Sequence, residues 1–202
     1  MTLAAQALAS QHDDLSAARR AMIDSQLRVS GINQDWLLAQ FARVPREDFV
    51  PVAARGHAYI DRALPLDGGA ALPAPLVQAK LLAAAEPAGD DKVLVVSASG
   101  YLAALVEPLV QSVETVEASA AIAIQSMPVY KLMLIDGAVE VLPQALVDAL
   151  EEGGRVVCGL VERGVTRVAT GRKSGGKVEL AAEADVGMPV LAEFAAPKRW
   201  SF

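Results

Sequence analysis

Short apolar runs alternate with helical segments along the second half of the chain. Four runs rich in Val, Ile and Leu predict buried strands, at 92–96, 112–117, 132–135 and 155–161. Segments that predict helices lie between them, at 102–110 and 143–150. Continuous apolar strands that alternate with helices indicate a parallel sheet covered on both faces, and hence an α/β fold.

The C-terminal part of the chain changes to a period of two. Residues 166–170 and 177–180 alternate in polarity and flank Ser174-Gly175-Gly176, which is a turn signal for a β-hairpin. Residues 189–194 are expected to be extended and to finish the sheet. The pattern therefore predicts a mostly parallel sheet that ends in an antiparallel hairpin.

The first half of the chain shows helical spacing of its apolar residues. Three helices are predicted, at 14–30, from Asn33 to Pro45, and at 76–86. Asp13 or Asp14 is expected to cap the first helix, and Asn33 the second. The stretch 63–75 is rich in Gly and Pro and predicts an extended loop.

Length and composition favour one domain over residues 1–202. We expect residues 1–75 to form a cap of helices and loop, and residues 76–202 to form the sheet-bearing core. The chain is 53% hydrophobic, which suffices for a sizeable core. Its net charge of -6 argues against a protein that binds nucleic acid through phosphates.

Cysteine and histidine are scarce, so no metal site is expected. Cys158 is the single cysteine and lies in an apolar run, and the two histidines are His12 and His57. One Cys and two His supply no chelating cluster for zinc. The chain starts without a basic leader and has no apolar run long enough to span a bilayer, so we expect no membrane association and a cytoplasmic location.

Candidate chemistry lies at the ends of the first two strands. Ligands of open parallel sheets bind beyond the carboxyl ends of the strands. The first strand leads into the small-residue loop 97–101, and the second ends in Glu117 about 20 residues later. A small-residue loop lets the backbone approach a nucleotide-like ligand, and a strand-end acid can bind both ribose hydroxyls. The candidate binding residues are therefore Ser99, Gly100, Tyr101 and Glu117, although a tight turn and a solvated charge would explain the same residues.

Blocks of residues in a fixed order add a family resemblance. They lie at 17–23 (AARRAMI), 44–51 (VPREDFVP), 134–138 (LIDGA) and 152–157 (EGGRVV). With these blocks the chain resembles protein-L-isoaspartate O-methyltransferases over about residues 15–202. The resemblance implies a class I, Rossmann-like methyltransferase fold with S-adenosylmethionine as cofactor. It also implies protein repair, in which the carboxylate of an isoaspartyl residue in a damaged protein or peptide is methylated.

Departures from the family fall on the residues that would do this chemistry. By the resemblance, Ala71 stands in place of an active-site threonine and Pro73 in place of the catalytic serine, so we assign no catalytic residue. The family's first-strand loop carries three glycines after an acidic residue, whereas this chain retains only Gly100. Arg46, Glu47 and Asp48 of the 44–51 block are expected to form local ion pairs.

The connection after Glu117 is also too short for the complete fold. Only residues 118–131, 14 residues, precede the strand at Leu132, whereas a βαβ unit takes about 30. We therefore expect edge strand 3 and its helix to be missing, together with the loop that contacts the adenine. The strand 112–117 then becomes a sheet edge, and exposed edges invite pairing. We expect a homodimer contact there or at the crossover 122–124, unless the edge glutamates keep the strand in solution.

Three interpretations follow. We favour a protein-L-isoaspartate O-methyltransferase-like protein with a degenerate donor site, impaired or non-catalytic and retained for binding or assembly. The alternative is an active S-adenosylmethionine-dependent O-methyltransferase acting on isoaspartyl residues. A nicotinamide-dependent dehydrogenase is the least favoured, because the glycine pattern is further still from that fingerprint.

Overall fold

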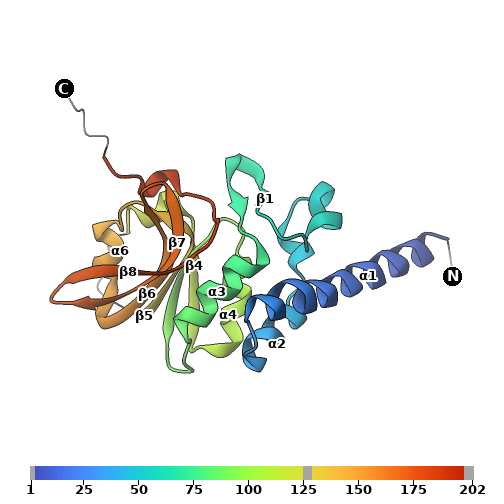
Figure 1. Cartoon of the computed structure of the whole chain (residues 1–202), viewed down its shortest axis with the longest axis horizontal. Helices are drawn as coiled ribbons and strands as arrows, with labels where there is room; N and C mark the ends of the chain where they lie inside the picture. Colours follow the sequence, from blue (N-terminus) through green and yellow to red (C-terminus); the bar gives the residue numbers. More distant parts are fainter. Residues whose placement is uncertain (1–2, 125–128, 198–202) are drawn as a thin grey trace.

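A six-stranded sheet with helices on both faces forms the body of the protein (Figure 1). The computed structural model describes residues 3–124 and 129–197. The strands of this sheet are β3 (Lys92–Val96), β4 (Ser112–Val116), β5 (Tyr130–Val139), β6 (Leu150–Glu162), β7 (Val165–Ser174) and β8 (Lys177–Asp185). They lie in the order β4-β3-β5-β6-β7-β8. The first four are parallel, and β7 and β8 are antiparallel, which confirms the expected class of fold.

Two apolar clusters lie on opposite faces of the sheet, because successive strand residues point to opposite sides. On β3, Val93 and Val95 belong to one cluster, and Leu94 and Val96 to the other. The helices of the structure are α1 (Leu3–Met22), α2 (Asp35–Arg43), α3 (Pro75–Ala85), α4 (Tyr101–Val106), α5 (Ala118–Ala121) and α6 (Gln144–Ala149). Helices α2, α3 and α4 pack on the first cluster, and α5 and α6 on the second.

The N-terminal helices begin elsewhere than the sequence predicts. Helix α1 starts at Leu3, so Asp13 and Asp14 lie inside it and cap nothing. After α1 the chain continues as a π-helix (Ile23–Leu27) and then as a 3-10 helix (Arg28–Ser30). It turns at Gly31, which has a φ of +87°. Helix α2 has Gln34 at its N-cap, without a side-chain cap, so the cap expected at Asn33 is absent.

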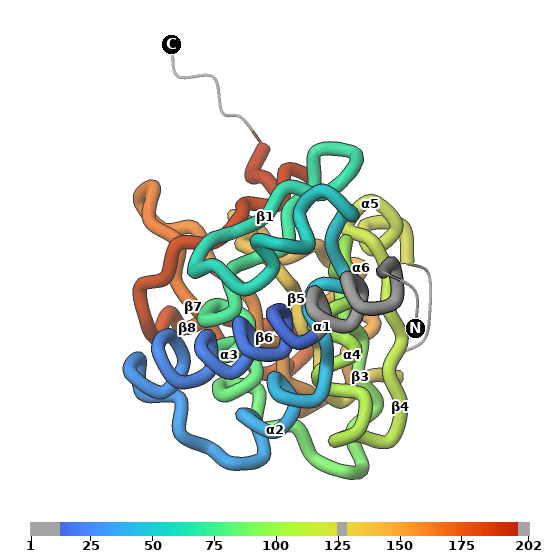
Figure 2. The backbone as a smooth tube through the Cα atoms, turned by 90° about the vertical axis from the view of Figure 1, so that its right-hand side faces the viewer, coloured from blue at the N-terminus to red at the C-terminus, as the bar shows by residue number. Residues whose placement is uncertain are grey.

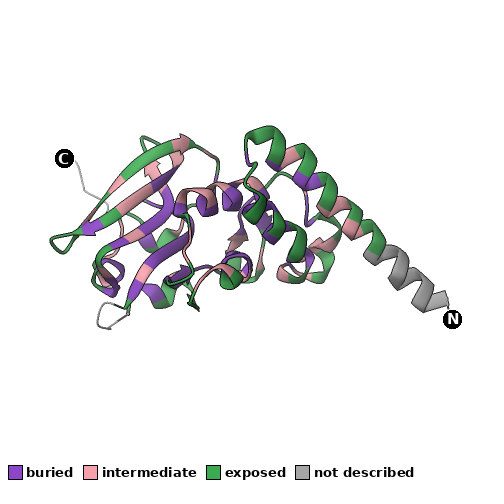
Figure 3. Ribbon diagram, turned by 90° about the horizontal axis from the view of Figure 1, so that it is seen from below, coloured by how far each residue is buried: buried purple, intermediate pink, exposed green. Residues whose placement is uncertain are grey.

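These helices gather on one side of the core. Figure 2 shows α1 and α2 on the side of the molecule that also carries α3 and α4, and α2 contacts both of the latter. Figure 1 shows that α1 reaches beyond the rest of the body, and Figure 3 shows exposed and part-buried residues along the described part of its surface. Trp36 of α2 is 37% exposed, whereas Leu37 and Phe41 of the same helix are fully buried.

The segment 63–75 contains a short hairpin rather than loop alone. Its strands are β1 (Leu64–Pro65) and β2 (Ala71–Leu72), joined by a turn at 67–69. Two further 3-10 segments, Arg46–Phe49 and Val52–His57, connect α2 to this hairpin. The hairpin stands above the carboxyl ends of the parallel strands in Figure 1 and so reaches the candidate site.

Residues 189–194 do not finish the sheet as an added strand. Val190 forms one isolated parallel bridge with Ala138, after which Ala192–Phe194 turns as a 3-10 helix. Phe194 is buried in the second apolar cluster and holds this segment against the body. The sheet itself ends at β8.

Strand β4 is the other edge of the sheet, as the short connection predicts. It pairs in parallel with β3, and the chain then crosses to β5 through α5. The described part of this crossover contains no further strand. In the parts of the chain that the structure describes, no helix has the length and apolar character needed to cross a membrane.

Candidate active site

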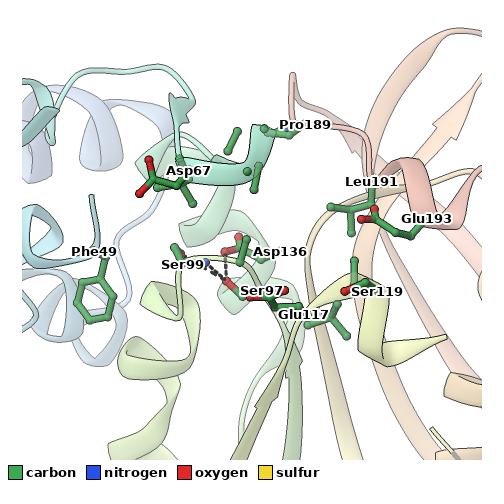
Figure 4. A pocket seen from close by; sticks show the side chains of 18 of the residues that line it. Phe49, Asp67, Ser97, Ser99, Glu117, Ser119, Asp136, Pro189, Leu191 and Glu193 are labelled. Atoms are coloured by element: carbon green, nitrogen blue, oxygen red, sulfur yellow. Dashed lines mark hydrogen bonds between the residues drawn. The ribbon is translucent and has the colours of Figure 1, made fainter. Parts of the chain in front are cut away.

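A cleft of about 870 Å³ opens at the carboxyl ends of β3, β4 and β5 (Figure 4). Its lining comes from residues 48–51, 66–71, 96–99, 117–119, Asp136 and 189–193. The N-terminal segments and the β1–β2 hairpin line one side. The start of α5 and the C-terminal segment line another, where Figure 4 shows Ser119, Leu191 and Glu193. The C-terminal segment thus forms part of the wall of the cleft.

The structure brings two of the four predicted binding residues to this cleft. Ser99 and Glu117 line it. Gly100 is the N-cap of α4, with φ +75°, a conformation that glycine adopts without strain. The Tyr101 side chain lies in the core, fully buried, with its ring packed against Phe49 at a centroid distance of 5.2 Å. Tyr101 therefore supports the loop from behind and does not face the cleft.

Serine hydroxyl groups accept hydrogen bonds from the backbone amides of the loop after β3. The Ser97 hydroxyl oxygen accepts from the N–H groups of Ser99 at 3.3 Å and Gly100 at 3.2 Å. The Ser99 hydroxyl oxygen accepts from the N–H of Tyr101 at 3.1 Å. Three successive amides therefore already have acceptors within the loop.

Asp136 forms the floor of the cleft and was not among the predicted site residues. It is 5% exposed and accepts from the Ser97 hydroxyl at 2.9 Å and from Gln78 Nε2, which lies 3.0 Å from both carboxylate oxygens. Burial raises the pKa of Asp136 to about 6, although the bonds from Gln78 and Ser97 act in the opposite direction. Its place after the apolar run 132–135 obeys the same strand-end rule that pointed to Glu117.

Arg46 lies behind this floor and is fully buried. Its guanidinium donates to the Ala58 carbonyl at 2.8 Å, to Gln78 Oε1 at 2.5 Å and to the Pro73 carbonyl. It also lies 5.1 Å from the centre of the Tyr101 ring. Desolvation lowers the pKa of Arg46 from its usual value. A buried polar chain thus runs from Arg46 through Gln78 to Asp136.

The local ion pairs expected in the 44–51 block are wrong. Arg46 bonds to carbonyl and amide oxygens, and Glu47 pairs with Arg19, whose Nη2 lies 2.9 Å from Glu47 Oε1. The Tyr59 hydroxyl also donates to Glu47. The block is packed between other N-terminal segments. Its charged side chains therefore bond to residues that are distant in sequence and not to each other.

The positions that the resemblance assigned to the threonine and serine differ in their surroundings. Ala71 lines the cleft, whereas Pro73 is buried and presents its carbonyl to Arg46. Neither side chain carries a hydrogen-bonding group.

Comparison with known proteins agrees with this architecture. A family model described as Protein-L-isoaspartate(D-aspartate) O-methyltransferase (PCMT) matches residues 17–129, more than half of the chain. The protein-L-isoaspartate O-methyltransferase of Koribacter versatilis is 32% identical over 187 residues, which cover 80% of this chain and 84% of the relative. The chain belongs to the protein-L-isoaspartate O-methyltransferase family.

Other members extend the comparison. The protein-L-isoaspartate O-methyltransferase of Methanoculleus marisnigri is 30% identical over 193 residues, covering 83% of this chain and 88% of the relative. A crystal structure from Plasmodium falciparum, described as a member of this family in complex with S-adenosyl-L-homocysteine, superposes with a TM-score of 0.71. That alignment covers 87% of this chain and 98% of the other at 17% identity, so it shows a shared fold.

The family uses S-adenosylmethionine, and the cleft fits this donor only in part. Its volume is within the range of small-molecule sites, and Glu117 stands where a ribose can be bound. The amino-acid end of the donor finds no free amide at residues 99 to 101, because these amides already donate to the hydroxyl groups of Ser97 and Ser99. No Lys, Arg or His is among the described residues that line the cleft.

The charged side chains among the described lining residues of this family member are all carboxylates. Five acidic residues contribute to it, namely Asp48, Asp67, Glu117, Asp136 and Glu193. Figure 4 shows four of them around the cleft, with Asp136 at its base. Nowhere in residues 3–124 and 129–197 do three His, Cys, Asp or Glu side chains gather in a way that could hold a metal ion.

Proposed function

We propose that this chain is a protein-L-isoaspartate O-methyltransferase family protein with a degenerate donor site, impaired in methyl transfer and retained for binding or assembly. The observation that carries the proposal is the charge of the cleft. Five carboxyl groups line it and no described lining residue is basic. The family's reaction brings an isoaspartyl carboxylate into such a cleft, next to a donor that carries a carboxylate of its own.

Electrostatics opposes that arrangement. Two like charges about 6 Å apart repel by about 0.7 kcal/mol in water and by about 3 kcal/mol at an effective dielectric constant near 20. Asp136 has a pKa of about 6 and is mostly ionised at neutral pH, so it adds to the repulsion at the floor. An anionic substrate therefore approaches without a compensating basic side chain among the described lining residues, and the amides of residues 99 to 101 are already bonded.

Loss of positioning groups supports the same proposal. Methylation of a carboxylate depends on holding an existing nucleophile against an activated methyl group and excluding water. Ala71 offers no hydroxyl to the cleft, and Pro73 is turned into the protein interior. The lining thus lacks the side chains that the resemblance assigned to this task.

The alternative is an active S-adenosylmethionine-dependent O-methyltransferase acting on isoaspartyl residues. The names of the relatives and the position of Glu117 in the cleft favour it. Transfer of labelled methyl groups from S-adenosylmethionine to an isoaspartyl peptide distinguishes the two functions. The enzyme from Koribacter versatilis, assayed in parallel, serves as the positive control.

One such repulsion between two carboxylates that is compensated in the control and not in this cleft would lower kcat/KM about a hundredfold relative to the control, since about 2.7 kcal/mol corresponds to two factors of ten. A rate within tenfold of the control would overturn the proposal. Calorimetric titration with S-adenosylmethionine then separates failure to bind the donor from failure to react.

We also propose that the β4 edge, or the crossover beside it, forms a homodimer contact. Strand β4 ends the sheet, and Ile122 at the end of α5 is 50% exposed. A second copy would cover both the open edge and this apolar side chain.

Sedimentation of the wild type and two variants tests the contact. Ile122→Glu is expected to shift a dimer to monomer, whereas Val165→Glu, on β7 and 43% exposed, is expected to leave it unchanged. A monomeric wild type at high concentration, or two variants that sediment alike, would rule the contact out.

A further inference from the structure

The loop between β3 and α4 is closed by its own side chains. The N–H groups of residues 99, 100 and 101 all donate to serine hydroxyl oxygens, at 3.1 to 3.3 Å. The first N–H groups of a helix otherwise lack partners in the helix and are available to a ligand. Here the side chains of Ser97 and Ser99 take that role before any ligand arrives.

Ser97 is anchored in this position from below. It is 6% exposed, and its hydroxyl donates to Asp136 at 2.9 Å. Asp136 is in turn fixed by Gln78, whose amide donates to both carboxylate oxygens. Turning Ser97 away from the loop would break its bond to Asp136 and its bonds to two amides together. Ser99 has no such anchor, because its hydroxyl faces only Ser97 at 3.4 Å and the amide of Tyr101.

We infer that Ser97, anchored by Asp136, together with Ser99 excludes the amino-acid end of the methyl donor by occupying the loop amides that this end would need. The inference rests on the proposed degenerate donor site and identifies the residues that make it so. Removal of the hydroxyls frees the amides and also the space beside Ala98, which is exposed in the cleft. The competing explanation is that Ser97 and Ser99 only stabilise a tight turn and do not affect binding of the methyl donor.

Hydrogen exchange of the three amides tests the geometry without any ligand. In Ser97→Ala the amides of residues 99 and 100 are expected to exchange at least about tenfold faster, the factor that one hydrogen bond is worth. In Ser99→Ala only the amide of Tyr101 should change. Ser30→Ala is the matched control, because Ser30 is exposed at the end of the 3-10 helix Arg28–Ser30, lies outside the lining of the cleft and makes none of these bonds. Unchanged exchange in both loop variants would overturn the inference.

Titration with S-adenosyl-L-homocysteine tests the consequence. The double variant Ser97→Gly, Ser99→Gly is expected to bind at least about tenfold more tightly than the wild type, and Ser30→Ala as weakly as the wild type. If Ser97 proves necessary for folding, Ser99→Gly alone should still improve binding, because its side chain is only half-buried.

The outcomes separate the two claims. A folded double variant with fast-exchanging amides and unchanged affinity refutes the inference and leaves the proposed function standing. Tight binding of the ligand by the wild type, with the three amides still protected, also refutes it. Efficient methyl transfer by the wild type refutes the proposed function, whatever the serine variants bind.

Discussion

Replacement of Arg46 by alanine should destabilise the protein by about 3 to 5 kcal/mol, the cost of removing one partner from a buried charged network. The guanidinium is fully buried and donates to Ala58, Pro73 and Gln78. Hydrogen bonds from a charged group contribute about 1.5 to 3 kcal/mol each, and the contact with the Tyr101 ring adds about 2 kcal/mol when desolvated. The several kcal/mol needed to bury the guanidinium offset part of this sum.

Urea unfolding followed by circular dichroism measures the loss. Arg20→Ala is the control, because Arg20 is exposed and bonds to Ser16 one turn away; it should cost less than about 0.5 kcal/mol. Arg46→Lys should lose nearly as much as Arg46→Ala, since one ammonium group cannot reach three diverging acceptors. A loss below about 1 kcal/mol in Arg46→Ala, with an unchanged m-value, would refute the assigned role of Arg46.

Three further predictions concern single sites. The folded-state pKa of Asp136, about 6, lies above its ordinary value of 3.8. The wild type should therefore gain stability relative to Asp136→Asn as the pH falls from 7 to 4, by about 2 kcal/mol in urea titrations. A stability difference that stays constant with pH would contradict the shift. Gly159→Ala should cost about 1 to 3 kcal/mol in the same assay, because the new Cβ would lie 2.7 Å from Ala138 Cα, whereas Gly56→Ala meets no neighbour within 4 Å and serves as its control. Cys158 is buried with a pKa raised to about 12, so a thiol reagent should modify it only at the rate of unfolding, and rapid labelling of the native protein would contradict that burial.

The sheet was predictable from the sequence because its strands are nearly continuous apolar runs. The run 92–96 became β3 with the predicted bounds, and the short connection after Glu117 correctly placed β4 at the edge. The strand predicted at 132–135 is longer in the structure, Tyr130–Val139, because main-chain pairing with β6 resumes at Ala138 and Val139 after an irregularity that contains Asp136 and Gly137. Polarity marks where a strand is buried and says less about where its hydrogen bonds end.

The candidate site was predictable in position but not in its bonding. The strand-end rule located Ser99 and Glu117, and applied once more it would have located Asp136. Tyr101 was misplaced because the rule follows the backbone of the loop, while the ring turns inward to the core. Gln78 carried no signal, since a glutamine in an apolar helix becomes a site residue only through the tertiary contact with Asp136.

The 44–51 block carries the clearest family resemblance, yet its buried residues act on structure. Arg46 joins the carbonyls of Ala58 and Pro73, two turns of the N-terminal cap, and reaches the sheet through Gln78. Removing the Arg46 guanidinium would affect every segment that it joins. Folding therefore constrains the residue at this position, whether or not a substrate is methylated. Family membership can therefore persist in this chain through its scaffold. In the loop 97–101 this role falls to Tyr101, which packs against Phe49 and Arg46, whereas the hydroxyl of Ser99 contacts only Ser97 and the Tyr101 amide within the loop itself.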